Sequence, residues 1–154
     1  RLLAEKTAVL SDAATRINRE IAHDVRIDRV RIDALGKMTL FGQDGCETRV
    51  ALSAGQMQIL IMSLVSALAE VTKYQAPLVI DTPLARLDES HRQGLFRHWQ
   101  GLQQQVILLS QDTEITPEVY RQLEGSVSKT YLVRAESLST GGAQSHVTEN
   151  TYFE

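Results

Sequence analysis

Hydrophobic positions recur with helical spacing at the start of the chain. Across residues 1–23 the apolar seam steps by four and three, and its members are Leu3, Thr7, Leu10, Ala14, Ile17 and Ile21. A coiled coil has this spacing, and an amphipathic helix packed on a core gives the same pattern over so short a stretch. We expect the end of a coiled-coil arm here, because the chain starts at Arg1 rather than Met and has the character of a piece of a longer protein.

From Asp24 to Val50 the pattern changes to short runs that predict strands. A first strand is expected from Val25 to Ile32, with one irregularity in its spacing, and a second from Met38 to Phe41. Gln43-Asp44-Gly45 carries the Asp-Gly signal of a hairpin, so Thr48 to Leu52 is the expected return strand.

A strongly periodic helix follows this hairpin. Its start is explicit, because Ser53 is a good N-cap and Gln56, three residues later, completes a capping box. One wide apolar face is expected to make the helix mostly buried. The residues of that face are Met57, Leu60, Ile61, Leu64, Val65, Leu68 and Val71.

Two continuous apolar runs further on predict buried strands. They cover Pro77 to Asp81 and Gln105 to Ser110, and a helix is expected between them from about Glu89 to Gly101. A short helix near Pro117 and strands at 127–134 and 145–153, around a Gly-Gly turn, complete the chain. This order predicts an α/β fold with a mixed sheet and flanking helices.

Composition limits the classes of function. The 154 residues suit one domain, and 43% hydrophobic residues suffice for a core. A net charge of −3 gives no bulk attraction to nucleic acid or anionic membrane, and Asp28 and Asp33 interleave with Arg26, Arg29 and Arg31 as on a solvated strand face. The single cysteine fits a reducing cytoplasm, and no apolar run approaches the roughly 18 residues that span a bilayer.

Polar residues at the ends of these elements are candidates for phosphate chemistry. A helix start with Ser53 and Gly55 presents free N–H groups and a positive dipole end, which binds phosphate, although a capping box alone is the simpler interpretation. Asp81 ends a buried strand, where it can hold Mg²⁺ through water. Gln111 follows the second strand, and the ends of parallel strands are where open α/β sheets bind ligands.

The order of these motifs resembles the C-terminal lobe of an ABC/SMC-type P-loop NTPase head. Residues 52–58, L-S-A-G-Q-M-Q, look like the family's signature L-S-G-G-Q-x-Q, with Ala54 departing. Leu78 to Asp81 resembles the Walker B strand, and Leu87-Asp88 resembles the D-loop. Ser110-Gln111-Asp112 falls where the switch is expected. The resemblance implies an N-terminal coiled-coil stub at 1–23 and the C-terminal half of a head at 24–154.

Finer detail resembles the DndD family of ATPases from bacterial DNA phosphorothioation systems. The segments concerned are "MTLFGQDG", "VIDTPLARLDESHR" and "QVILLSQDTEIT". The resemblance implies ATP and Mg²⁺ as ligands, a homodimer of ATP-bound heads, and a cytoplasmic location. It further implies as partners the N-terminal half of the same head, other proteins of the phosphorothioation system, and DNA through the full assembly.

The same resemblance assigns roles to single residues. The catalytic set is Asp81, which also holds the metal, with Gln111 and Asp88; Ser53, Ala54, Gly55 and Gln56 contact the nucleotide. Two departures bear on turnover. Thr82 stands where the family has a catalytic Glu, and Gln111 stands where it has a His. Either Asp88, Asp112 or Glu114 positions the attacking water, or hydrolysis is slow.

A P-loop is missing from this sequence. Its only Gly-Lys pair, Gly36-Lys37, is followed by Met38, and Arg31 stands where the first glycine belongs. We therefore expect half of a composite site and no activity from the isolated chain. Two alternatives stay open: an SMC-type ATPase of DNA repair, and a non-catalytic coiled-coil scaffold that binds partner proteins.

Overall fold

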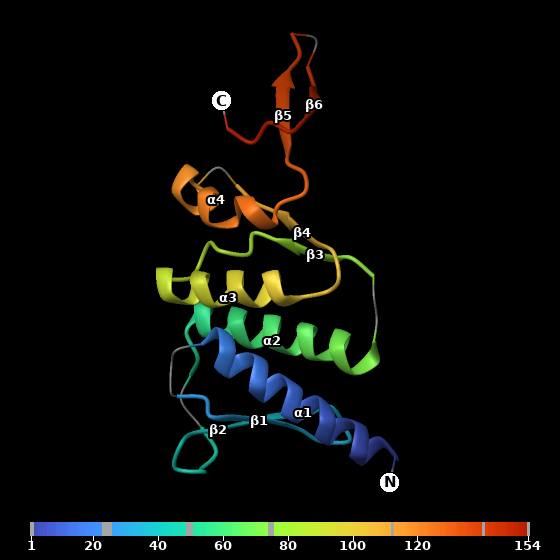
Figure 1. Cartoon of the computed structure of the whole chain (residues 1–154), viewed down its shortest axis with the longest axis vertical. Helices are drawn as coiled ribbons and strands as arrows, with labels where there is room; N and C mark the ends of the chain where they lie inside the picture. Colours follow the sequence, from blue (N-terminus) through green and yellow to red (C-terminus); the bar gives the residue numbers. More distant parts are fainter. Residues whose placement is uncertain are drawn as a thin grey trace. The chain divides into compact units, whose positions relative to one another are not determined.

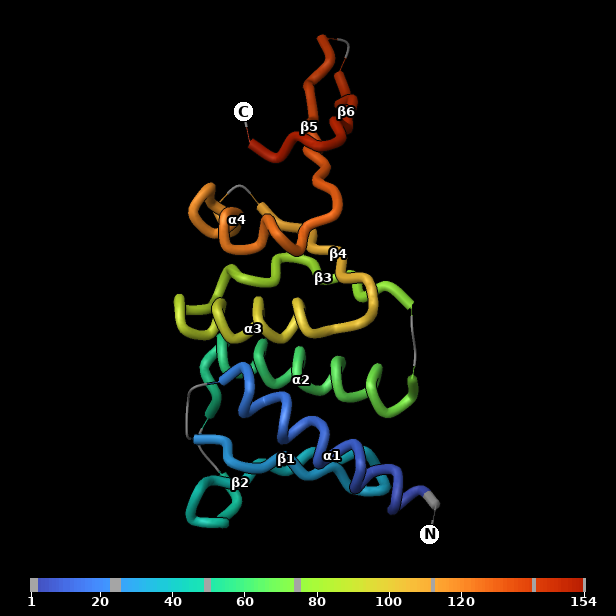
Figure 2. The backbone as a smooth tube through the Cα atoms, in the orientation of Figure 1, coloured from blue at the N-terminus to red at the C-terminus, as the bar shows by residue number. Residues whose placement is uncertain are grey.

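The structure of the chain is a computed structural model. It describes residues 2–22, 26–48, 51–73, 76–111, 113–139 and 141–153. The chain forms two compact units, Arg1–Glu114 and Ile115–Glu154. Figure 1 labels the helices and strands, and Figure 2 traces the same backbone as a tube.

The first helix, α1 (Leu2–Ile21), is embedded in the first unit by its C-terminal half. Ala14, Ile17 and Ile21 of the predicted seam are almost completely buried, whereas Leu3 near the other end is 57% exposed. The predicted helix is therefore confirmed, and its deep half packs as an amphipathic core helix. The assignment of residues 1–23 to a coiled-coil arm stays a prediction.

A two-stranded antiparallel sheet lies against α1. Strand β1 (Arg29–Ile32) pairs with β2 (Met38–Phe41), and Val30 is opposite Leu40. The outer edge of β1 is occupied by α1, because Thr15 Oγ1 and Ser11 Oγ each accept a backbone N–H of β1, from Val30 and Ile32, at 2.9 Å. Hydroxyl groups of a helix thus satisfy an edge that would otherwise need a third strand.

The predicted strands of this region were partly wrong. The first strand begins at Arg29, and Val25 of the expected strand lies outside the described residues. The expected return strand is absent from described residues 48, 51 and 52; instead Glu47 forms an isolated bridge with Phe41, and Thr48 N–H donates to Leu40 at 2.8 Å. The chain leaves the sheet because it must reach the cap of the next helix at Ser53.

The second helix, α2 (Ala54–Thr72), packs against α1, and Arg16 on α1 donates to Glu70 on α2 at 2.7 Å. The predicted buried face was wrong for several of its residues. Met57, Ile61 and Leu68 are between 43% and 48% exposed. The buried residues are instead Ile59, Leu60, Ser63, Ser66 and Ala67. The helix is apolar nearly all round, so its sequence pattern could not show which side faces the core.

This helix also corrects the expectation about membrane-spanning length. Among the described residues, Ala54–Thr72 is long and apolar enough, by length and composition, to cross a membrane. The core helix of a folded domain meets the same criterion, and α2 packs on α1 inside the first unit.

A parallel pair of strands forms the other side of the first unit. Strand β3 (Leu78–Asp81) pairs with β4 (Val106–Leu109), and α3 (Glu89–Gly101) connects them, as predicted. Figure 1 shows α3 drawn between α2 and this pair. The prediction that these strands are buried was wrong for one face, because Ile80 is 4% exposed whereas Val79 and Leu109 are 58% and 50% exposed.

The second unit contains a short helix and a hairpin. Helix α4 (Pro117–Leu123) has Thr116 as its N-cap and is followed by the 3-10 turn η1 (Glu124–Ser126). Strands β5 (Tyr131–Ser137) and β6 (Ala143–Glu149) pair antiparallel. The hairpin was predicted, but both strands lie closer to the Gly-Gly turn than expected. β5 starts four residues later and ends three residues later, and β6 starts two residues earlier and ends four residues earlier.

Candidate functional site

The start of α2 is built by four consecutive residues. Ser53 Oγ accepts the N–H of Gln56 at 3.2 Å, and Gln56 Oε1 accepts the N–H of Ser53 at 2.9 Å. The predicted capping box is therefore confirmed. It leaves the N–H groups of Ala54 and Gly55 without an acceptor among the described residues, at the positive end of a 19-residue helix dipole.

Gly55 is required by a close approach that the sequence did not reveal. A Cβ atom added at this position would lie 2.6 Å from the carbonyl oxygen of Arg86, in the loop that follows β3. Real Cβ atoms essentially never come so close to another heavy atom. Gly55 is thus a contact surface for this loop, in addition to leaving the helix start accessible.

A second contact fastens α2 to the same loop. The side-chain amide of Gln58 donates to the carbonyl of Pro83 at 2.6 Å and, at 3.4 Å, to that of Thr82. Pro83 and Leu84 are both buried. The signature segment and the loop that follows Asp81 therefore form one packed element.

The strand ends bring together the predicted residues of the Walker B strand and the switch. Asp81 is paired with Leu109, and Thr82 N–H donates to the Leu109 carbonyl at 2.8 Å. Asp81 and Gln111 both have exposed side chains close to this edge. Asp112, a further candidate at the edge, lies outside the described residues.

Thr82 has an unusual backbone. Its φ angle is +45°, in the left-handed region that β-branched residues rarely adopt. Such a conformation costs of order 1–3 kcal/mol and persists where its surroundings enforce it. Here two hydrogen bonds enforce it: the Thr82 N–H donates to the Leu109 carbonyl, and the Thr82 carbonyl accepts from the Gln58 side-chain amide.

Two candidate carboxylates have structural partners. Asp88 is the N-cap of α3, where Oδ1 accepts the N–H of His91 at 3.0 Å and the hydroxyl of Ser90 at 2.9 Å. The hydrogen bond from the His91 amide is the largest cause that lowers the pKa of Asp88 below its usual value. Glu114 is 3% exposed, and its oxygens accept the N–H groups of Leu84 at 2.9 Å and Gln111 at 3.1 Å.

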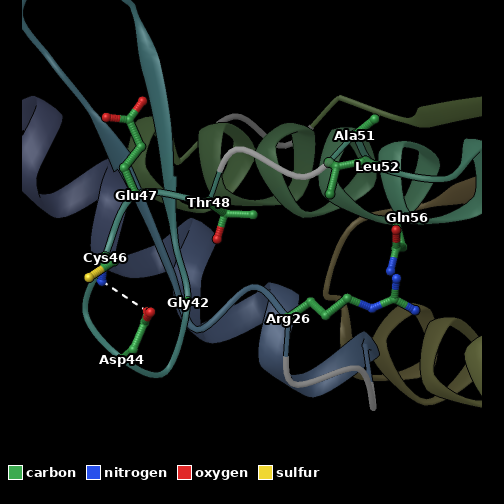
Figure 3. A pocket seen from close by; sticks show the side chains of 9 residues that line it. All are labelled: Arg26, Gly42, Asp44, Cys46, Glu47, Thr48, Ala51, Leu52 and Gln56. Atoms are coloured by element: carbon green, nitrogen blue, oxygen red, sulfur yellow. Dashed lines mark hydrogen bonds between the residues drawn. The ribbon is translucent and has the colours of Figure 1, made fainter.

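A pocket of about 270 Å³ lies beside the start of α2, between the helix and the loop after β2. In Figure 3 the guanidinium of Arg26 extends toward Gln56, while Asp44 accepts the Cys46 N–H at 3.0 Å within the loop after β2. Sequence reasoning grouped Arg26 with Arg29, but the two separate in the structure, since Arg29 lies over the ring of Phe41 at 4.4 Å. No local pattern relates Arg26 to the helix start.

A metal ion at this site would have a single carboxylate as its protein ligand. Among the described residues, no group of three or more His, Cys, Asp and Glu side chains could together hold a metal ion. Asp81 remains an exposed carboxylate at a strand end, which suits an ion held mainly by water and by a ligand's phosphates.

Comparison with known proteins shows the fold. No family model and no curated protein matches the sequence. A solved structure on ATP-driven dimerization and DNA-stimulated activation of SMC ATPases matches with a TM-score of 0.64 and 13% identity, over 96% of this chain and 88% of that one.

Two further structures agree with this. The Smc head domain from Pyrococcus furiosus, with an extended coiled coil and bound to the C-terminal domain of ScpA, matches 92% of this chain at a TM-score of 0.61 and 14% identity. The SMC head domain from Thermotoga maritima matches 91% at a TM-score of 0.55 and 13% identity. The chain spans 35% and 46% of these two structures. It therefore has the mixed α/β fold of an SMC ATPase head lobe.

Proposed function

We propose that this chain is the C-terminal half of an SMC-like ATPase head. It would supply a signature segment and a Walker B strand to ATP sites that form when two heads meet. The observation that supports this most is the close contact between Gly55 and the carbonyl oxygen of Arg86, because it joins the start of α2 to the loop that follows Asp81. A helix start that served only as a cap would not need this contact.

The residues present fit ATP and Mg²⁺ in part. The amides of Ala54 and Gly55, with the hydroxyl of Ser53, suit the terminal phosphate of a nucleotide held by the opposite head. The carboxylate of Asp81 would hold Mg²⁺ through water, and the ion would neutralise charge on the phosphates. Gln111 at the end of β4 would orient water or contact phosphate, and Asp88 would complete the D-loop.

The remaining phosphate contacts must come from another segment. Gly36-Lys37 lies in the turn between β1 and β2, where Asp33 Oδ1 accepts the Leu35 and Lys37 N–H groups at 2.8 and 2.9 Å. We propose that the N-terminal half of the same head supplies the P-loop. A parallel strand pair is normally covered on both faces, and the open apolar face here offers that half a surface. This face consists of Val79, Ile107 and Leu109.

The finer assignment is to a DndD-like ATPase of a cytoplasmic DNA phosphorothioation or restriction system. It rests on the resemblance of the segments 38–45, 79–92 and 105–116. Its partners would be a second copy of the head, other proteins of that system, and DNA bound by the full assembly. An SMC-type ATPase of DNA repair is the alternative within the same class.

A non-catalytic scaffold is the second candidate function. Thr82 favours it, because a hydroxyl at this position cannot take a proton from water at neutral pH. Glu114 favours it too, since its carboxylate is buried and already accepts hydrogen bonds from Leu84 and Gln111.

The test compares the full-length protein with its Ser53→Arg and Asp81→Asn variants. We expect ATP with Mg²⁺ to double the mass measured by light scattering, and Ser53→Arg to abolish this change while circular dichroism stays unchanged. Asp81→Asn should lower steady-state ATP turnover. Dimerisation without nucleotide dependence, together with no turnover, would favour the scaffold.

The finer assignment has its own measurement. Phosphorothioate linkages in DNA are cleaved by iodine, so genomic DNA from cells that carry the whole system reports modification directly. Loss of iodine cleavage with Asp81→Asn would support a role in modification. Unchanged cleavage with lost protection against foreign DNA would instead assign the protein to restriction.

A further inference from the structure

The structure contains one buried carboxylate whose purpose the proposed reaction does not explain. Glu114 is 3% exposed, and burial of a carboxylate is costly unless hydrogen bonds compensate it. The compensation comes from two different loops. One oxygen accepts the N–H of Leu84 after β3, and the other accepts the N–H of Gln111 after β4.

The turn that carries Glu114 is closed on itself. The N–H of Glu114 donates to the carbonyl of Gln111 at 2.9 Å, while the Gln111 N–H donates back to Glu114 Oε2 at 3.1 Å. The backbone of Gln111 is therefore held at both its donor and its acceptor. Its exposed side chain starts from a fixed position at the end of β4.

The loop after β3 is held from its other side by α2. Gln58 donates to the Pro83 carbonyl, one residue from the amide that Glu114 accepts, and Gly55 contacts the Arg86 carbonyl. Hydrogen bonds and packing thus run from the start of α2 through residues 82–86 to Gln111. All of these contacts lie within the first unit.

We propose that Glu114 is a positioning residue that locks the loop after Asp81 to the segment of Gln111. The signature segment and the switch glutamine then move as one body when a second head engages. This inference rests on the proposed ATPase function. It also gives Glu114 a role other than activating water, because the carboxylate is 3% exposed and each of its oxygens already accepts a backbone N–H.

The test uses Glu114→Gln in the full-length protein. Glutamine has the same shape, but its NH₂ group faces one of the two backbone N–H groups and cannot accept a bond from it. We expect kcat for ATP to fall roughly 10- to 100-fold through misplacement of the reacting groups, with KM nearly unchanged. In a Gln111→Ala background the same substitution should have little further effect on kcat.

A matched control separates positioning from loss of stability. Leu95→Ala removes a fully buried side chain from α3, outside both loops. Assayed below its melting temperature, this variant should keep the wild-type kcat. If kcat falls in proportion to the melting temperature in both Glu114→Gln and Leu95→Ala, the proposal is overturned. A Glu114→Gln variant with the wild-type kcat would overturn it too. Loss of one limb of the pH profile in Glu114→Gln would instead show that Glu114 exchanges a proton.

Hydrogen exchange of the full-length protein provides a reading that does not depend on ATP. Glu114→Gln should raise exchange of the Leu84 and Gln111 amides together, while the amides of β1 stay protected. Unchanged exchange at both would refute the lock. If the wild-type protein shows no ATP turnover and Glu114→Gln still raises exchange at both amides, the proposed function is refuted while the lock is supported.

Discussion

The start of α2 and the loop after β3 contribute to the same candidate site, but different kinds of contact hold them in place. The helix start is local, because Ser53 and Gln56, three residues apart, satisfy each other. The loop is held by residues far away in sequence, since Gln58 and Glu114 hold Pro83 and Leu84 from either side. Because its contacts are local, the helix start can be predicted from sequence. The conformation of the loop after β3 depends instead on the folding of the whole unit.

The difference extends to strain. Ser53 has an extended backbone, with φ −65° and ψ 162°, as an N-cap should. Thr82 has φ +45°, which its own side chain disfavours. Strain is therefore concentrated in the region that tertiary contacts hold, which is where a catalytic carboxylate is expected in the family that the motifs resemble.

The largest expected effect is at the strained residue. In the full-length protein, Thr82→Glu should raise kcat for ATP by about 10²–10⁴-fold, because a carboxylate can orient and partly deprotonate the attacking water. Glutamate is not β-branched, so the left-handed backbone should tolerate it at least as well as threonine. Steady-state turnover at saturating ATP measures this.

The matched control is Thr82→Gln, which has the length of glutamate but cannot accept the proton. It should stay near the wild-type rate. Equal rates for wild type and Thr82→Glu would mean that another group already activates water, and would turn attention to Asp112.

The contact between the two regions can be broken directly. Gly55→Ala places a Cβ atom 2.6 Å from the Arg86 carbonyl oxygen, so the loop or the helix must shift. Overpacking of this kind typically costs 1–3 kcal/mol, which exceeds the gain in helix propensity from alanine. The free energy of unfolding, measured with urea, should fall accordingly.

The neighbouring substitution Ala54→Ser is the control for Gly55→Ala. Ala54 is exposed, and a surface change there should stay within about 0.5 kcal/mol. A Gly55→Ala protein as stable as wild type would show that the loop yields easily, and the two regions would then be less tightly joined than the contact indicates.

The smallest effect is expected at the local cap. Ser53→Ala should cost about 1 kcal/mol, because it leaves the Gln56 amide without its acceptor. Ser53→Asp should keep most of the stability, since aspartate also caps helices, while its charge should repel a phosphate and weaken ATP-driven dimerisation. A Ser53→Asp protein that dimerises like wild type would restrict Ser53 to capping.

Sequence alone determined the elements whose signals are local. The capping box at Ser53, the parallel strand that ends in Asp81, the helix that starts after Asp88 and the strand before Ser110 all appear as predicted, within a residue or so. Caps and apolar runs depend on neighbours within a few residues, so they can be read from order alone.

Tertiary structure decided what local order could not express. The buried side of α2 was predicted wrongly, because apolar residues surround the helix and only its packing on α1 selects a face. The expected return strand is reduced to a single bridge between Glu47 and Phe41, because the chain leaves β2 to reach the cap of α2 at Ser53. Three features depend on contacts between residues up to 31 positions apart: the close approach of Gly55, the left-handed backbone of Thr82 and the burial of Glu114. Such contacts exist only once the chain has folded.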